Sequence, residues 1–135
     1  MSTVVATNIN TDALVGNTSA NSITVRGEGS ATTVLNQGLC KAWSNNAGGS
    51  SISINDSFNV SSITDDGLGD IGNVFTNPMA SANYCVSVDG GYQNDDGIAK
   101  QSFTTSEWGT YAYNEGSRDA KDATSNQYTV HGDLA

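Results

Sequence analysis

The sequence predicts an all-β fold, an antiparallel and jelly-roll-like β-sandwich preceded by an extended N-terminal arm. Apolar and polar residues alternate with a period of two in several short segments, most clearly between Ile52 and Val60. Groups of Gly, Asn, Asp and Ser separate these segments at intervals of roughly 8–12 residues, which is typical of a sandwich or barrel. No segment has the i, i+3, i+4, i+7 spacing of an amphipathic helix over three turns.

The composition is polar but weakly charged. Apolar residues make up 36% of the 135 residues and charged residues 14%, whereas globular domains are usually about 45–50% apolar. A single proline, two Trp, five Tyr and three Phe favour a β-rich protein over a disordered one. Disorder remains an alternative for roughly the first 40 residues, where the alternation is lost.

Two regions are expected, an N-terminal arm or anchor at 1–35 and a β-sandwich domain at 36–135. Within the arm, 22–26 and 31–35 are short strands joined by a turn at 27–30. The arm is expected to attach to a neighbouring protein through its apolar side chains, which are Val4, Val5, Ile9, Leu14 and Val15.

The rest of the chain reads as a series of strands. A first strand at 38–43 is followed by a polar loop at 44–50. The nine residues from Ile52 to Val60 form one strand whose apolar side chains share a face, and 61–64 continue it. Asp56 interrupts that face and marks a bulge, a polar contact in the core or a solvated edge. The Asp-Gly turn at 65–70 and the returning strand at 71–76 predict a hairpin. Further strands are expected at 82–88, 99–105, 107–113 and 126–131, with a charged loop at 114–125.

The formal net charge of −9 disfavours nucleic-acid partners and anionic membranes, which attract basic proteins. No basic segment followed by an apolar one begins the chain, so we expect synthesis in a cytoplasm without Sec secretion. No apolar run approaches the ~18 residues of a membrane-spanning helix, so no membrane insertion is expected.

Residues for catalysis are scarce. The single histidine is His131, and the sequence contains neither a Gly-x-Ser-x-Gly elbow nor a phosphate-binding glycine motif. We therefore expect no enzymatic activity and no cofactor. Cys40 and Cys85 are expected to be free thiols packed in or near the core. A disulfide bond between them is the alternative.

Two acidic clusters fall in glycine-containing segments, Asp65, Asp66 and Asp70 in one and Asp95 and Asp96 in the other. Asp is favoured in such turns because its side chain bonds the nearby backbone. Calcium binding at Asp65, Asp66 and Asp70 is the alternative, and glycoside hydrolysis by a carboxylate pair is a remote third.

Aromatic side chains near the C-terminus offer a possible platform for a glycan or receptor. The candidates are Tyr92, Trp108, Tyr111 and Tyr113, together with the loops at 44–50 and 89–97. In a regular strand Trp108 and Tyr111 lie on opposite faces. The alternative is that these rings pack in the core or between subunits.

One part of the chain, from about Gly38 to Val88, has a distinctive order of motifs. It contains the letters KAW at 41–43, SFNVSSITDDGLGD at 57–70 and FTNPMASANY at 75–84. This order resembles a module of tailed-phage virion proteins, found in tail fibres, head fibres and decoration proteins of phages of aquatic bacteria. The arm and the last third of the chain are outside the resemblance.

The resemblance implies a β-structured, trimeric protein on the exterior of a virion. Such modules usually end long fibres, whereas this chain begins at Met1 and is short. A capsid fibre, a decoration protein or a short tail appendage therefore fits better than a full-length tail fibre. Other virion proteins and a second and third copy of the chain are the expected partners. The alternative is a receptor- or glycan-binding tail-fibre module for host adsorption.

Overall fold

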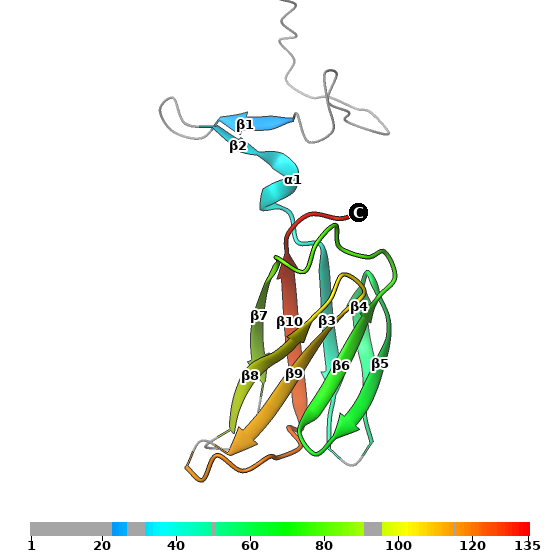
Figure 1. The fold of residues 1–135 in the computed structure, drawn as a ribbon, viewed down its shortest axis with the longest axis vertical. Coiled ribbons are helices and arrows are strands. Elements are labelled where there is room, and N and C mark those ends of the chain that lie inside the picture. Colours follow the sequence, from blue (N-terminus) through cyan, green and yellow to red (C-terminus); the bar gives the residue numbers. More distant parts are fainter. Residues whose placement is uncertain (1–22, 27–31, 50, 91–95, 115) are drawn as a thin grey trace, which may run out of the picture. The chain divides into compact units, whose positions relative to one another are not determined.

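A computed structural model describes residues 23–26, 32–49, 51–90, 96–114 and 116–135 (Figure 1). The chain divides into two units between Asn36 and Gln37, one residue after the boundary expected from the sequence. The apolar residues of the expected anchor, together with Tyr92 and the turn at 27–30, lie outside the described residues.

The first unit contains two short antiparallel strands, β1 (Thr24–Arg26) and β2 (Thr32–Val34). The Leu35 N–H closes this pair by donating to the Ile23 carbonyl at 2.7 Å. Both strands were predicted. The one-turn helix α1 (Leu35–Gly38) follows and was not predicted, since it runs from the last residue of the expected strand 31–35 to the first residue of the expected strand 38–43.

The second unit is a β-sandwich of two four-stranded antiparallel sheets that pack together (Figure 1), which confirms the predicted fold class. The first sheet has the order β4-β3-β10-β7 and the second β5-β6-β9-β8. The strands of the first sheet are β3 (Ala42–Ala47), β4 (Ser53–Phe58), β7 (Cys85–Gly90) and β10 (Ser125–His131). Those of the second are β5 (Val60–Gly67), β6 (Asp70–Phe75), β8 (Asp96–Phe103) and β9 (Glu107–Asn114).

The prediction of one continuous strand over 52–64 is wrong, because the chain changes sheets at Asn59. β4 ends at Phe58 in the first sheet and β5 begins at Val60 in the second. Asn59 has a φ of 57°, in the left-handed region that Asn tolerates better than most residues. This conformation turns the chain between the two layers.

The prediction that Ile52 to Val60 share one face is also wrong, because a bulge shifts the register. β3 and β4 lose register between Asn45 and Asn46, so Asn55 has no partner on β3. Ile54 lies opposite the buried Asn46, whereas Asp56 lies opposite Asn45. The structure shows two of the three possibilities for Asp56, because it lies next to the bulge and is also exposed on β4, an edge strand of the first sheet.

The predicted hairpin is confirmed, with a shorter turn than expected. β5 extends to Gly67 and β6 begins at Asp70, which leaves Leu68 and Gly69 as the turn. The expected loop at 44–50 is shorter too, since β3 continues to Ala47. The last two predicted strands agree with β9 and β10 within a residue.

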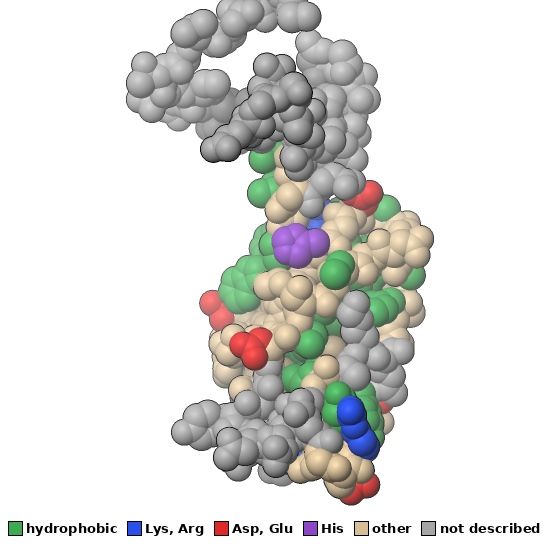
Figure 2. All heavy atoms as spheres, turned by 90° about the vertical axis from the view of Figure 1, so that its left-hand side faces the viewer, with side chains coloured by type: hydrophobic (Ala, Val, Ile, Leu, Met, Phe, Trp, Pro, Cys, Tyr) green, Lys and Arg blue, Asp and Glu red, His purple; other side chains and the backbone are tan. Residues whose placement is uncertain are grey.

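The core between the sheets has an apolar and a polar part. The apolar part is built of Ala42, Phe75, Met79, Tyr84, Val86, Trp108, Tyr128 and Val130. The buried polar side chains include Ser44, Asn46, Asn73, Thr110 and Asn126. Polar residues thus occupy interior positions that apolar ones usually fill, which contributes to the low apolar content of the chain. Uncharged polar and hydrophobic atoms also dominate the face of the molecule seen in Figure 2.

Candidate functional site

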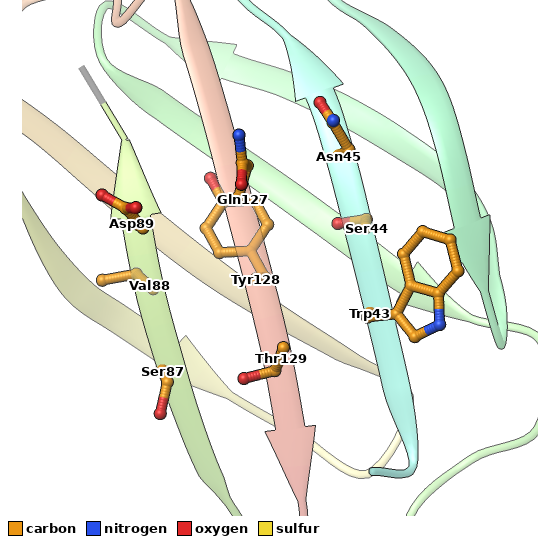
Figure 3. Close-up of a pocket in the computed structure, with 9 residues that line it drawn as sticks. All are labelled: Trp43, Ser44, Asn45, Ser87, Val88, Asp89, Gln127, Tyr128 and Thr129. Carbon is orange, nitrogen blue, oxygen red and sulfur yellow. The ribbon is translucent and has the colours of Figure 1, made fainter. Parts of the chain in front are cut away.

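A hollow lies over β3, β10 and β7, on the outer face of the first sheet (Figure 3). Strand register aligns the outward side chains in two rows across these strands. One row is Trp43, Thr129 and Ser87, and the other is Asn45, Gln127 and Asp89. Their inward neighbours Ser44 and Tyr128 are buried, so the strand alternation itself presents these rows to solvent.

This hollow, called the Trp43 groove below, has a volume of about 420 Å³. Its lining offers amide, hydroxyl and carboxylate groups but no Lys or Arg. Trp43 lies at one edge, with its ring on the side of β3 away from β10 (Figure 3). Phe58 lies opposite Trp43 on β4 and is 53% exposed. An aromatic edge beside amide, hydroxyl and carboxylate groups suits a polar, uncharged ligand better than an anionic one.

The aromatic platform expected from the sequence does not form as a unit. Trp108 is fully buried and packs on Phe75, with ring centroids 4.7 Å apart. Because it has no exposed surface, its assignment as a glycan contact is wrong and the core alternative holds for it. Its inward position follows from the alternation of β9, which also buries Thr110 and Ala112.

Tyr111 and Tyr113 lie on the outer face of the second sheet, away from the Trp43 groove. Their rings stack with centroids 6.4 Å apart and planes at 23°. The Arg118 guanidinium lies 5.1 Å from the centre of the Tyr113 ring, a cation–π distance. The predicted opposition of Trp108 and Tyr111 on β9 is confirmed. Both tyrosines are half-buried, so they offer ring edges more than an open platform.

The calcium alternative at Asp65, Asp66 and Asp70 is wrong. Among the residues that the structure describes, no three acidic, His or Cys side chains form a group that could hold a metal ion. Asp65 and Asp66 are neighbours in β5, and consecutive side chains of a strand point to opposite faces. Asp65 instead accepts a hydrogen bond from the Gly67 N–H at 3.2 Å, the backbone role expected of Asp beside a turn.

Cys40 and Cys85 are both free thiols. Cys40 is half-buried and donates to the Ala42 carbonyl at 3.0 Å. Cys85 is exposed, contrary to the prediction, because its neighbours Tyr84 and Val86 face the core. His131 is also exposed and lies opposite Cys85 at the end of β10.

Two outward residues of the Trp43 groove could be predicted from the sequence. Asn45 and Asp89 fall within the loops proposed for binding, although both lie in strands. Trp43 and Gln127 were not singled out, because the pairing of β3 with β10 joins residues more than eighty positions apart. The alternation of buried Ala42 with Trp43 was the available signal for an outward tryptophan.

No protein-family model, curated protein or solved structure matches this chain. Within the described part of the chain, no helix is long and apolar enough to cross a membrane.

Proposed function

We propose that this chain is a non-enzymatic structural protein on the exterior of a tailed-phage virion, as a capsid fibre, decoration protein or short tail-fibre-like component. The observation that carries the proposal is the ordered likeness of residues 38–88 to a module of such virion proteins. A β-sandwich is the fold expected of that module. The proposed assembly is a homotrimer bound to other virion proteins.

The positions of the motif residues support a structural role. Phe75, Met79 and Tyr84 from the third motif are core residues, and the Tyr84 hydroxyl lies 2.7 Å from the Glu107 carbonyl. Asn59 and Gly69 from the second motif occupy the sheet crossover and the hairpin turn. The motif residues that resemble the phage module therefore build the fold, as expected for a protein whose task is to present a stable surface.

Quantitative mass spectrometry of density-gradient-purified particles tests this proposal. The chain should be present in many copies per particle and should cosediment with the capsid or tail proteins. Its presence in the lysate together with its absence from the particles would contradict the proposal.

A second candidate is a receptor- or glycan-binding module for host adsorption, and the Trp43 groove favours it. Trp43 and Phe58 belong to the module motifs but lie on the outer face of the first sheet and not in the core. The groove beside them carries the hydrogen-bonding groups of Asn45, Gln127 and Asp89. Aromatic surfaces with a few placed polar groups are usual in ligand sites.

Binding of the fluorescently labelled chain to host cells tests the second candidate. Saturable binding should be lost in Trp43→Ala and retained in Tyr111→Ala, which removes a ring from the opposite sheet. Equal binding by both variants would exclude the Trp43 groove as the adsorption site. Binding to particles alone would leave the structural role as the function.

A further inference from the structure

The interior of the sandwich contains a cluster of amide side chains built from both sheets. Asn46 on β3 lies directly opposite Asn126 on β10, and Asn73 on β6 lies directly opposite Trp108 on β9. Each of these four residues is at most 1% exposed. They bring polar atoms into a space that is closed to bulk solvent.

Hydrogen bonds connect part of this cluster across the two sheets. The Asn46 Nδ2 donates to the Asn73 Oδ1 at 2.9 Å, and the Ser44 Oγ donates to the same oxygen at 3.3 Å. Thr110 and Tyr128 form a separate pair, with hydroxyl oxygens 2.9 Å apart. These bonds satisfy some of the buried polar atoms and leave others without a hydrogen-bond partner.

Four buried atoms of the cluster make no hydrogen bond within the described part of the protein. They are Asn46 Oδ1, Asn73 Nδ2, Trp108 Nε1 and Asn126 Nδ2. A buried polar atom without a partner destabilises the folded state, and such atoms are rare in native proteins. Their residues are connected, because Asn46 is bonded to Asn73, Asn126 lies opposite Asn46 and Trp108 lies opposite Asn73.

Rotation of the amides does not remove the problem. If Asn46 and Asn73 both exchange oxygen and nitrogen, their mutual bond is kept with the donor reversed. One amide atom of each side chain is then still unpaired. The Trp108 indole N–H can only donate, so it needs an acceptor in every arrangement.

We propose that this amide cluster is an internal binding site for ordered water, which completes the hydrogen bonding between the two sheets. Because a water molecule accepts at most two hydrogen bonds, at least two molecules are needed to accept from the three free N–H donors, and one of them donates to the free Asn46 oxygen. A metal cation does not fit a set with three N–H donors. A bound anion is disfavoured because no Lys or Arg belongs to the cluster. Buried water in native proteins commonly satisfies such groups. This site is independent of the proposed virion role.

Water-to-protein cross-relaxation in the NMR spectrum of the ¹⁵N-labelled full chain tests the inference. The chain has two tryptophans, and Trp43 on the outer face is the internal control for Trp108 in the core. The Trp108 indole N–H should show a cross-peak to water with NOE and ROE of opposite sign, the signature of a long-lived bound water. The Trp43 indole should show only the contact expected of surface solvent.

Either of two results would overturn the inference. One is the absence of a water cross-peak at the Trp108 indole N–H, with NOEs from this proton to protein protons alone. The other is a shift of that resonance on replacing chloride by a larger anion, which would show an anion site. A crystal structure at atomic resolution gives an independent check. It should show water bonded to at least two of the four atoms, and an interior filled by protein alone would contradict the proposal.

Discussion

Asn59 combines an unusual backbone conformation with several side-chain hydrogen bonds. Its Nδ2 donates to the carbonyls of Lys41 and Asn77 at 3.0 and 3.1 Å, and its Oδ1 accepts from the Asn77 N–H at 2.7 Å. These bonds join the crossover to the segment before β3 and to the segment after β6. The side chain therefore fixes the point at which the chain passes between the sheets.

Replacing this side chain should destabilise the sandwich. Asn59→Ala removes the bonds and retains a φ of 57° that Ala tolerates poorly, so we expect a loss of about 2–3 kcal/mol in the free energy of unfolding. Urea denaturation followed by tryptophan fluorescence measures this change. Asn83→Ala is the control, because Asn83 is exposed, and it should cost less than about 0.5 kcal/mol. Equal changes in the free energy of unfolding of the two variants would show that the hydrogen bonds of Asn59 do not stabilise the sandwich.

Tyr128 links the apolar and polar parts of the core. Burial raises the pKa of its phenol to about 12, although the hydrogen bond with Thr110 opposes this rise. Burial likewise raises the pKa of Tyr84 to about 12. Because both values exceed the ordinary value of 10, the stability they contribute is complete below pH 10 and is lost as the pH rises through about 12.

An alkaline titration followed by phenolate absorbance and circular dichroism checks this prediction. Two phenols should ionise only near pH 12, together with the loss of β structure. Tyr128→Phe should remove one of these two late transitions. An unchanged number of late transitions in this variant would contradict the assignment.

At the scale of the element, the β5–β6 hairpin depends on Gly69. Its φ is 76°, and a Cβ at this position would meet the Ala112 carbonyl and lie 2.9 Å from the Lys121 carbonyl oxygen. Its N–H also donates to the Asp122 Oδ1 at 2.8 Å. The turn therefore packs against the loop between β9 and β10 at the end of the sandwich.

Gly69→Ala should lower the free energy of unfolding by at least about 2 kcal/mol, since it adds a left-handed non-glycine residue and a backbone contact. Leu68→Ala is the matched control in the same turn, because Leu68 is 62% exposed. Thermal denaturation should separate the two variants clearly. Comparable melting temperatures would show that the turn adapts to a side chain.

The N-terminal unit is proposed to anchor the protein to the particle. Deletion of residues 1–21 should abolish attachment to particles and leave the β-sandwich folded, because the sandwich begins after Asn36. Cosedimentation measures attachment, and circular dichroism measures folding. A truncated protein that still decorates particles would disprove the anchor.

Strands could be predicted from the sequence where the alternation of apolar and polar residues depends on neighbouring residues alone. Alternation identified β9 and β10 and the hairpin of β5 and β6, since each depends on neighbouring residues. The same alternation failed between Ile52 and Thr64. A period-two pattern contains no information on a left-handed residue such as Asn59 or on an unpaired residue such as Asn55. Both features depend on contacts with distant strands.

At the scale of the whole molecule, the sequence predicted the sandwich, but one of its four aromatic candidates, Trp108, lies in the core, and the outward Trp43 was not among them. Trp108 and Trp43 both lie in strands with alternating neighbours, and only the packing of the two sheets decides which ring is inside. The polar part of the core was also not predictable. Buried Asn side chains look like surface residues until the pairing of Asn46 with Asn126 is known.

The central claim is that this protein lies on the outside of a tailed-phage virion. Immunogold electron microscopy of intact, purified particles with an antibody against the sandwich, residues 37–135, tests it most directly. Gold label is expected on the outer surface, over the capsid for a head fibre or decoration protein and at the tail for an adsorption component. Intact particles without label, in a lysate that contains the protein, would contradict a location on the virion.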